Sequence, residues 1–237
     1  MIVKKIHYCW FGRGEKPGLV RRCMAGWQKH LPDYELIEWN EENFNININR
    51  FVSQAYKDKN YAFVSDYARA WALYRQGGVY LDTDVEVIKN FDKFLENDFF
   101  AGFEYGDFVG SCLIGSIAGH KLLRQYLDYY DERPYFLPDG KKYTDTSVLL
   151  LSELTARYGF KMNGKTQNIK GASLYSKSYF SPYNYVDATY EIKEETHSIH
   201  HFSQSWLPLN VRLKTQAKRL AVRLLGKNFV KRVRALR

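Results

Sequence analysis

Two aspartates, Asp82 and Asp84, follow an apolar run in the segment GGVYLDTDVEV, residues 77–87. In an extended chain their side chains point to the same side, because side chains alternate along a strand with a period of two. Two carboxylates on one side repel each other, so a divalent cation or a set of hydrogen-bond donors has to compensate their charge. Ligands that are all oxygen favour Mg²⁺ or Mn²⁺ over Zn²⁺. The spacing therefore indicates a metal site, although a solvated turn acid beside a helix N-cap has the same spacing.

A second charged pair precedes this strand. Asp66 and Arg69 are three residues apart in YAFVSDYARAWALYRQ, residues 61–76, and such a spacing places both on one face of a helix. An exposed ion pair of this kind is worth only about 0 to 1 kcal/mol. The helix is mostly apolar on its other faces and leads directly into the DxD strand, which favours a position for the pair in the same crevice.

Two histidines follow near the end of the chain, in HSIHHFSQSW, residues 197–206. In a strand His200 and His201 face opposite ways, so at most one of them joins a given metal site. Alternation does not decide which one. The alternative is one core histidine and one exposed histidine.

The elements around these residues predict an α/β fold with a parallel sheet. Apolar residues with a period close to 3.6, followed by two glycines, predict a helix over residues 61–76. The next residues, VYL, are apolar on both faces and predict a central strand, whose carboxyl end is where ligand crevices of open α/β sheets lie. We expect further strands at 2–11, 34–39, 99–104, 109–115, 172–180 and 197–202, and further helices at 18–30, 51–57, 119–131 and 145–158.

Length and composition predict one globular domain with a tail. The 237 residues suffice for one sizeable α/β domain and are marginal for two. Hydrophobic residues make up 45% and aromatic residues 16%, as in a folded protein. We expect a domain over residues 1–208 and a tail over residues 209–237.

The cysteines and the N-terminal segment bear on the compartment. The three cysteines, Cys9, Cys23 and Cys112, are an odd number without CxxC spacing, which favours a reducing environment. The N-terminal segment MIVKKIHYCWFG is interrupted by Lys and His, so it predicts a first strand and not a signal peptide. The sequence contains no run of about 18 apolar residues that would span a membrane. We expect the main domain in the cytoplasm.

The positive charge is concentrated in the tail. Residues 209–237 hold ten of the 35 basic residues and no acid, so residues 1–208 hold 25 basic and 26 acidic residues, a net charge of −1. A basic amphipathic helix is typical of anchors on anionic membrane surfaces, here the inner face of the cell membrane, and we expect no nucleic-acid partner. A solvated basic end or a partner contact is the alternative. The apolar face would be Leu213, Ala217, Leu220 and Leu224, and the bases largely off it Arg212, Lys218, Arg219 and Arg223.

Taken in order, IHYCWFG, SDYARAWALYRQGGVYLDTDVEV and HHFSQSW resemble the family-32-type glycosyltransferases with a DXD sugar-binding region, over roughly residues 2–206. This group includes capsular and lipopolysaccharide glycosyltransferases, and it is distantly similar to the catalytic domains of clostridial glucosylating toxins. The resemblance implies a GT-A fold, with a Rossmann-like, mostly parallel sheet. It also implies retaining transfer of a Glc, Gal or GlcNAc type hexose from a UDP-sugar to a glycan acceptor, such as a lipid-linked intermediate in capsular or cell-surface polysaccharide synthesis.

The resemblance also implies roles for residues of the donor site. Trp10, at the Trp of the family's IHxxWxG motif, would stack on the uracil. Asp66 and Arg69 would hold hydroxyls of the donor sugar, and Tyr80 would belong to the nucleotide-sugar site. All four stand in the matching segments quoted above.

The same resemblance implies a Mn²⁺ or Mg²⁺ site. Asp84 would bind the metal directly, and Asp82 would contact ribose or sugar and, through water, the metal. His201 stands five residues before the closing Trp, where the toxin-like enzymes carry a metal-binding side chain. Trp206 would donate its indole N–H to the diphosphate, assisted by Ser205.

The sequence departs from the family pattern around GDFVGSCLIGS. Many relatives carry an Asn where Gly110, Ser111 and Cys112 stand here. Asp145 is a possible substitute or acceptor contact, but an ordinary helix N-cap is the favoured explanation for it.

Two functions from other classes compete with glycosyl transfer. One is a DxD phosphatase, in which the first Asp is a nucleophile. Glu86 stands where such enzymes carry a small hydroxyl residue or Val, and no convincing later Lys and acidic pair follows. The other is a non-catalytic protein that binds membrane surfaces through its tail.

Overall fold

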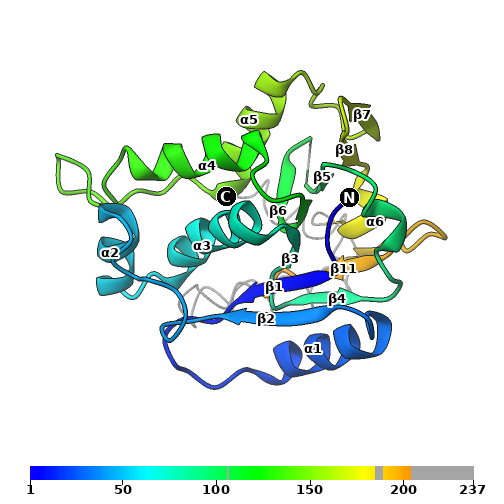
Figure 1. The fold of residues 1–237 in the computed structure, drawn as a ribbon, viewed down its shortest axis with the longest axis horizontal. Coiled ribbons are helices and arrows are strands. Elements are labelled where there is room, and N and C mark those ends of the chain that lie inside the picture. Colours follow the sequence, from blue (N-terminus) through cyan, green and yellow to red (C-terminus); the bar gives the residue numbers. More distant parts are fainter. Residues whose placement is uncertain (106, 185–188, 204–237) are drawn as a thin grey trace, which may run out of the picture.

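A sheet of seven strands forms the centre of the fold (Figure 1). The computed structural model describes residues 1–105, 107–184 and 189–203. The strands of this sheet are β1 (Lys5–Cys9), β2 (Glu35–Trp39), β3 (Gly78–Leu81), β5 (Phe99–Phe103), β6 (Val109–Ser116), β7 (Gln167–Ile169) and β8 (Ala172–Tyr175). They follow the order β2-β1-β3-β6-β5-β8-β7, and β6 and β7 run opposite to the other five. The predicted α/β class with a mostly parallel central sheet is confirmed.

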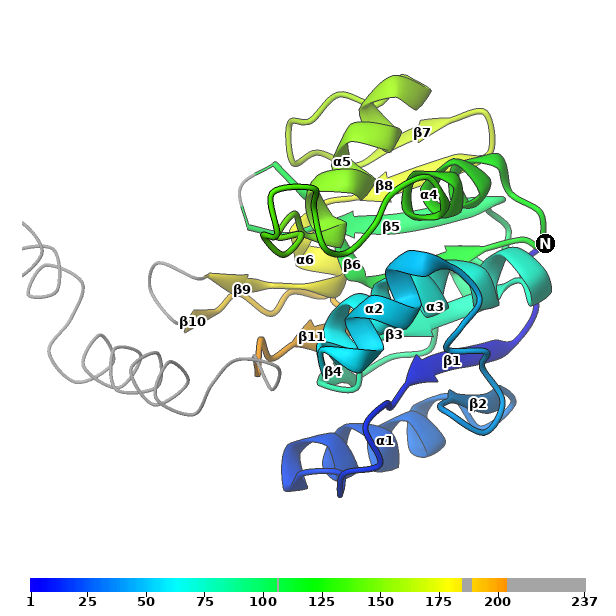
Figure 2. The ribbon, with the colours of Figure 1, turned by 90° about the vertical axis from the view of Figure 1, so that its left-hand side faces the viewer.

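Helices and two small sheets complete the described part of the chain. The helices are α1 (Gly18–His30), α2 (Arg50–Lys57), α3 (Tyr61–Gln76), the 3-10 helix η1 (Asp92–Phe94), α4 (Lys121–Asp131), α5 (Ser147–Tyr158) and α6 (Lys177–Phe180). The small sheets pair β4 (Val85–Val87) with β11 (Ser198–His200), and β9 (Tyr183–Asn184) with β10 (Thr189–Tyr190). Figure 2 shows both small sheets beside the lower half of the main sheet.

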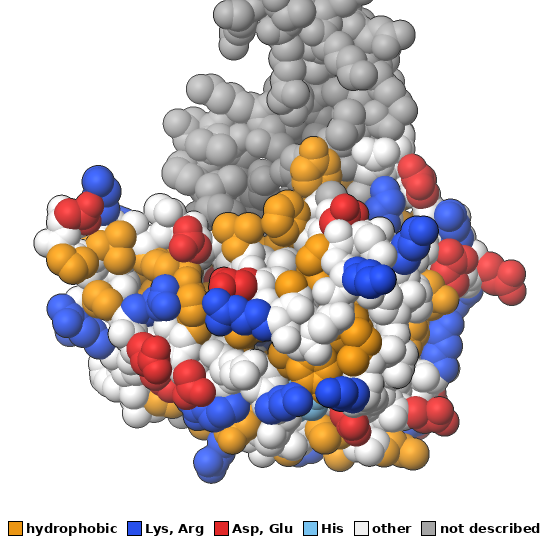
Figure 3. All heavy atoms as spheres, turned by 90° about the horizontal axis from the view of Figure 1, so that it is seen from above, with side chains coloured by type: hydrophobic (Ala, Val, Ile, Leu, Met, Phe, Trp, Pro, Cys, Tyr) orange, Lys and Arg blue, Asp and Glu red, His pale blue; other side chains and the backbone are white. Residues whose placement is uncertain are grey.

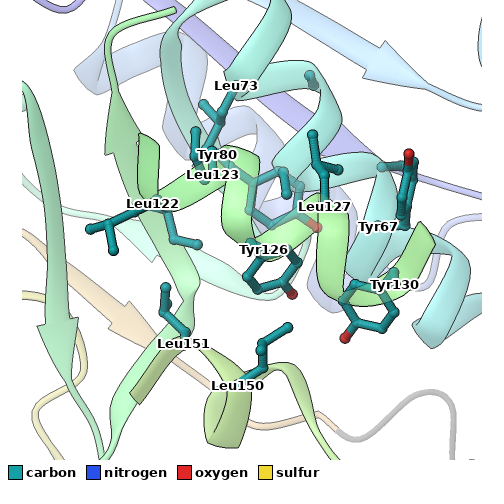
Figure 4. Packing of buried hydrophobic residues seen from close by; sticks show 14 of the residues in the cluster. Tyr67, Leu73, Tyr80, Leu122, Leu123, Tyr126, Leu127, Tyr130, Leu150 and Leu151 are labelled. Atoms are coloured by element: carbon teal, nitrogen blue, oxygen red, sulfur yellow. The ribbon is translucent and has the colours of Figure 1, made fainter. Parts of the chain in front are cut away.

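The main sheet is buried on both faces, as the apolar run VYL predicts. On β3, Val79 and Leu81 belong to one core cluster, which includes Trp27 of α1. Tyr80 points the other way, into a larger cluster with side chains of α2, α3, α4 and α5. Figure 4 shows part of this larger cluster, with Tyr126 of α4 among leucines of α3, α4 and α5. The position of β3 between two covered faces places its carboxyl end at the centre of the molecule.

Two glycines carry the chain from α3 into β3. The helix has the predicted bounds, and Gly77 and Gly78 follow it with φ of 65° and 113°, in the left-handed region that favours glycine. A Cβ on Gly78 would lie 2.8 Å from the backbone oxygen of Lys5 on β1. The glycine therefore also lets β3 approach β1, and the short connection keeps the charged pair of α3 near the end of β3.

Two predictions about other elements are wrong. The helix predicted from residue 145 begins at Ser147 with Thr146 as its N-cap, so the exposed Asp145 lies outside the helix and does not cap it. The strand predicted over 172–180 is the short strand β8 followed by the helical turn α6. Apolar spacing alone does not separate a strand from a helix over so few residues.

The surface of the described part of the chain carries mixed charge. On the face shown in Figure 3, Lys and Arg side chains alternate with Asp and Glu side chains, in keeping with the near-neutral charge of residues 1–208. Within the described ranges no helix is both long and apolar enough to cross a membrane. The predicted boundary at residue 208 and the predicted basic helix over 209–237 lie outside the described residues.

Candidate active site

The two aspartates of the DxD segment stand in a turn between β3 and β4. The backbone N–H of Val85 donates to the carbonyl oxygen of Asp82 at 3.0 Å, so the extended arrangement predicted for this segment is wrong. The turn still brings the carboxylates together. Ligand atoms of Asp82, Asp84 and His200 all lie within 4.8 Å of one another.

Arg69 holds this turn from the side of α3. One terminal nitrogen, Nη2, lies 3.0 Å from Oδ1 of Asp66 and 3.2 Å from Oδ1 of Asp82, and Nη1 donates to the carbonyl oxygen of Ser111 at 2.9 Å. The guanidinium carbon also lies 4.8 Å from the ring centroid of Tyr80, whose hydroxyl donates to Asp82 at 3.0 Å. Arg69 is only 5% exposed, so this is a buried network and not a surface ion pair.

The three carboxyl groups around the turn differ in how strongly their surroundings favour the charged form. Burial raises the pKa of both Asp66 and Asp82, and the single guanidinium of Arg69 that they share lowers it by less. Burial also acts to raise the pKa of Asp84, but His200 and the N–H of Ser203 outweigh it and hold that pKa well below its usual range. Asp84 is therefore the carboxylate most firmly kept in its charged form.

The structure brings His200, and not His201, to the two aspartates. Nε2 of His200 lies 3.4 Å from Oδ1 of Asp84. The His201 ring faces the other way, with Nε2 at 2.8 Å from Glu86 and Nδ1 at 3.2 Å from the Tyr190 hydroxyl. Of the two histidines, only His200 lies beside the aspartates, so the expectation that His201 is the one placed there is corrected. The reason is the register of β11 on β4, which pairs His200 with Val85, the residue after Asp84.

Two residues of this site were missed from the sequence. Glu104, directly after β5, places Oε1 3.0 Å from Nδ1 of His200. The N–H of Ser203 donates to Oδ2 of Asp84 at 2.7 Å. An available signal for Glu104 was its position, since an acid at the carboxyl end of a fully apolar strand lies where ligand crevices form. For Ser203 we see no such signal, because its contact is made by the backbone.

The other predicted site residues have different surroundings. Trp10 follows β1, which is parallel to β3, and it is half-buried with its indole N–H donating to the carbonyl oxygen of Gly14 at 2.7 Å. The Lys16 ammonium lies 5.7 Å from its ring centroid. Asp145 is exposed ahead of α5. Ser205 and Trp206 lie outside the described residues.

The geometry fits a divalent cation. Two carboxylates and one imidazole converge within 4.8 Å, and the carboxylates come from a turn supported by Arg69 on one side and by Ser203 on the other. Oxygen and imidazole ligands together suit several divalent ions, so the donor set indicates a metal site without naming the ion.

A known protein family matches the part of the chain that carries the aspartates. Residues 17–101 match the family described as "Glycosyltransferase sugar-binding region containing DXD motif". The chain contains one D-x-D sequence, Asp82-Thr83-Asp84, and it lies in this range. This match supports a glycosyltransferase with a DXD sugar-binding region, and it favours neither the phosphatase nor a purely membrane-binding protein.

One solved structure shares this fold, and a second is less similar. "PaToxG Glycosyltransferase" is similar at a TM-score of 0.52 with 16% identity, over 67% of this chain and 70% of that chain. "Crystal structure of a glycosyltransferase involved in the glycosylation of the major capsid of PBCV-1" is similar at a TM-score of 0.48 with 12% identity, over 90% of this chain and 98% of that chain. At such identity the first likeness shows the fold alone, and the fold is of the GT-A type. No curated protein sequence matches the chain.

Proposed function

We propose that the protein transfers a hexose from a UDP-sugar to a glycan acceptor, with retention at the anomeric carbon, and that transfer requires Mn²⁺ or Mg²⁺. One observation carries this proposal: Asp82, Asp84 and His200 converge within 4.8 Å in a glycosyltransferase with a DXD motif. Convergence of this kind supports a cation-dependent donor site, because carboxylates held this close repel each other unless positive charge compensates them.

The cation would be held by Asp84 and His200, with Asp82 contacting it through water. When bound, a divalent cation compensates the charge of the diphosphate as it leaves. Arg69 fixes Asp82 by their 3.2 Å contact and adds a permanent positive charge to this side of the site. The carboxyl of Asp66, 3.0 Å from Arg69, would accept a hydrogen bond from a hydroxyl of the donor sugar.

The nucleotide would lie along the carboxyl ends of β1 and β3. Trp10, which follows β1, would stack on the uracil, and Tyr80 would support the site through its 3.0 Å hydrogen bond to Asp82. Trp206 and Ser205 would contact the diphosphate. Their sequence position, a few residues after His200, supports this role.

The acceptor would be a glycan carried by a lipid, in capsular or cell-surface polysaccharide synthesis. The basic, amphipathic pattern of residues 209–237 supports this acceptor, because an enzyme at the inner face of the cell membrane meets lipid-linked intermediates there. Within this proposal residues 1–208 form the catalytic domain and the protein is cytoplasmic, peripheral to the membrane.

Calorimetry of nucleotide binding tests the metal-dependent donor site. UDP is titrated into the protein with Mn²⁺, with Mg²⁺ and with chelator, and GDP serves as the comparison. Binding of UDP that requires the cation and exceeds that of GDP supports the proposal. Equal binding with chelator overturns the metal requirement, and proton NMR of the glycoside product decides between retention and inversion.

A further inference from the structure

We propose that Glu104 is a positioning residue that orients His200 for cation binding through its second ring nitrogen. This inference rests on the proposed metal site and adds a residue to it. Glu104 follows β5, and its N–H donates to the carbonyl oxygen of Phe108 at 2.8 Å, which fixes it at the base of the β5–β6 connection.

The hydrogen bonds of the His200 ring define the role. Oε1 of Glu104 lies 3.0 Å from Nδ1, and Nε2 lies 3.4 Å from Oδ1 of Asp84. A proton on Nδ1 donated to Glu104 leaves Nε2 as the nitrogen that faces the DXD turn. Metal-binding histidines commonly use such a carboxylate partner, which fixes tautomer and ring orientation and makes the ligand more basic.

A glycine on the neighbouring strand provides a second observation. A Cβ on Gly110 of β6 would lie 2.3 Å from Cγ and 2.4 Å from Cδ of Glu104. The Glu104 side chain therefore lies directly across this glycine, and any side chain at position 110 would displace the carboxylate. The pairing also gives a reason for glycine in the segment where the family resemblance leads one to expect Asn.

The nearby thiol of Cys112 does not replace the Glu104 carboxylate as the partner of the His200 ring. Cys112 offers Sγ within 4.8 Å of the ligand atoms of Glu104 and His200. A thiol is a weak hydrogen-bonding group, so it is a poorer partner for the ring than a carboxylate. Glu104, which is 7% exposed, supplies the negative charge on this side of the ring.

Mn²⁺ affinity tests the inference, measured by the paramagnetic resonance of free Mn²⁺ in titrations of the full chain. Glu104→Met removes the acceptor while keeping a side chain of similar length, and we expect the Kd for Mn²⁺ to rise about 10- to 100-fold. Glu104→Gln keeps an acceptor without the charge, so its Kd should lie between those of the wild type and Glu104→Met. Gly110→Ala displaces the intact carboxylate and should also weaken binding.

Matched variants separate this role from packing and from the metal site itself. Glu86→Gln changes the analogous partner of His201, 2.8 Å from its ring, and should leave the Kd for Mn²⁺ unchanged. If His200→Ala binds Mn²⁺ like the wild type, or the wild type binds none, the proposed metal site is wrong. If His200→Ala weakens binding while Glu104→Met and Glu104→Gln do not, only the role of Glu104 is overturned. Equal losses in both Glu104 variants, matched by equal losses in thermal stability, would also overturn it in favour of packing.

Discussion

Nε2 of His200, at the end of β11, lies 3.4 Å from Oδ1 of Asp84, in the turn that leads into β4. This contact closes the DXD turn from the C-terminal part of the described chain, while Arg69 of α3 holds Asp82 from the other side. The site is therefore assembled from three distant segments around one turn.

Replacing Asp84 by Asn should abolish cation-dependent transfer. The amide keeps the shape of the side chain and can still accept from the N–H of Ser203, but it lacks the negative charge that holds the cation. We expect the rate of UDP release with Mn²⁺ to fall at least about 100-fold, because a bound metal stabilises leaving charge by several kcal/mol. Asp139→Asn, at an exposed ion pair with Lys141, is the control and should keep its rate. An Asp84→Asn rate equal to that of the control would remove the DXD motif from the mechanism.

Replacing Arg69 by Met should destabilise the fold as well as the site. The buried carboxyl group of Asp66 and the partly buried one of Asp82 would lose their shared guanidinium, and breaking a buried ion pair such as Arg69–Asp66 costs about 3 to 5 kcal/mol. The free energy of unfolding in urea measures this cost. Adding Asp66→Asn should restore part of it, because one uncompensated charge is removed. The exposed pair of Arg157 and Glu153 is the reference, and Arg157→Met should cost at most about 1 kcal/mol. Equal costs at the two arginines would mean that the network is not buried as described.

Replacing Trp10 by Ala should weaken binding of the donor without stopping the chemical step. Stacking of a base on an aromatic ring is worth about 1 to 3 kcal/mol, so KM for the UDP-sugar should rise about 10-fold or more while kcat changes little. Trp10→Phe keeps a ring and should show a smaller rise. A KM that stays the same in Trp10→Ala would place the uracil elsewhere.

His7 makes stability depend on pH below neutrality. Its ring is fully buried in the neutral form, where Nε2–H donates to the carbonyl oxygen of Gly77 at 2.8 Å and Nδ1 accepts from the Trp39 indole N–H at 3.1 Å. Burial lowers the pKa of His7 from 6.5 to about 4. Because the folded pKa is depressed, its contribution is present above pH 6.5 and is lost as the pH falls to about 4, by up to about 3 kcal/mol.

The unfolding free energies of the wild type and of a His7→Gln variant, each measured as a function of pH, isolate this contribution. His7→Gln keeps a donor and an acceptor but does not titrate, so its unfolding free energy should fall less than that of the wild type between pH 6.5 and pH 4. Parallel curves for the two proteins would show that His7 is not buried in its neutral form.

The tail should bind anionic membranes through its charge. In the full chain, glutamine replaces four bases of the predicted helix: Arg212, Lys218, Arg219 and Arg223. Each base near an anionic surface contributes about 1 kcal/mol, so binding to phosphatidylserine vesicles in co-sedimentation should fall strongly. Vesicle binding that does not change would contradict the membrane-surface proposal, while neutral vesicles control for nonspecific sedimentation.

Much of the fold and part of the site could be predicted from the sequence. The helix over 61–76 is marked by its apolar period and by the two glycines that follow it. These glycines adopt the positive φ of the turn, which other residues rarely adopt, so the bounds of the helix were predictable. The same helix carries Asp66 and Arg69 at a spacing that places them together. Short elements such as β9 and β10, of two residues each, depend on their pairing partners and have no local signal.

The choice between the two histidines shows why the rest could not be predicted. Alternation gives opposite directions for His200 and His201, but only the register of β11 on β4 decides which direction faces the aspartates. That register depends on contacts between segments far apart in the chain. The position of Glu104 beside His200 depends on the same contacts, and on the space above Gly110.

Release of UDP from a panel of donors tests the central claim most directly. UDP-Glc, UDP-Gal and UDP-GlcNAc are incubated with the full chain without acceptor, with Mn²⁺ and with chelator. We predict slow release of UDP from one donor, abolished by the chelator, which would also identify the sugar. No release from any donor, together with no cation-dependent binding of UDP in calorimetry, would contradict a UDP-sugar site at the DXD turn.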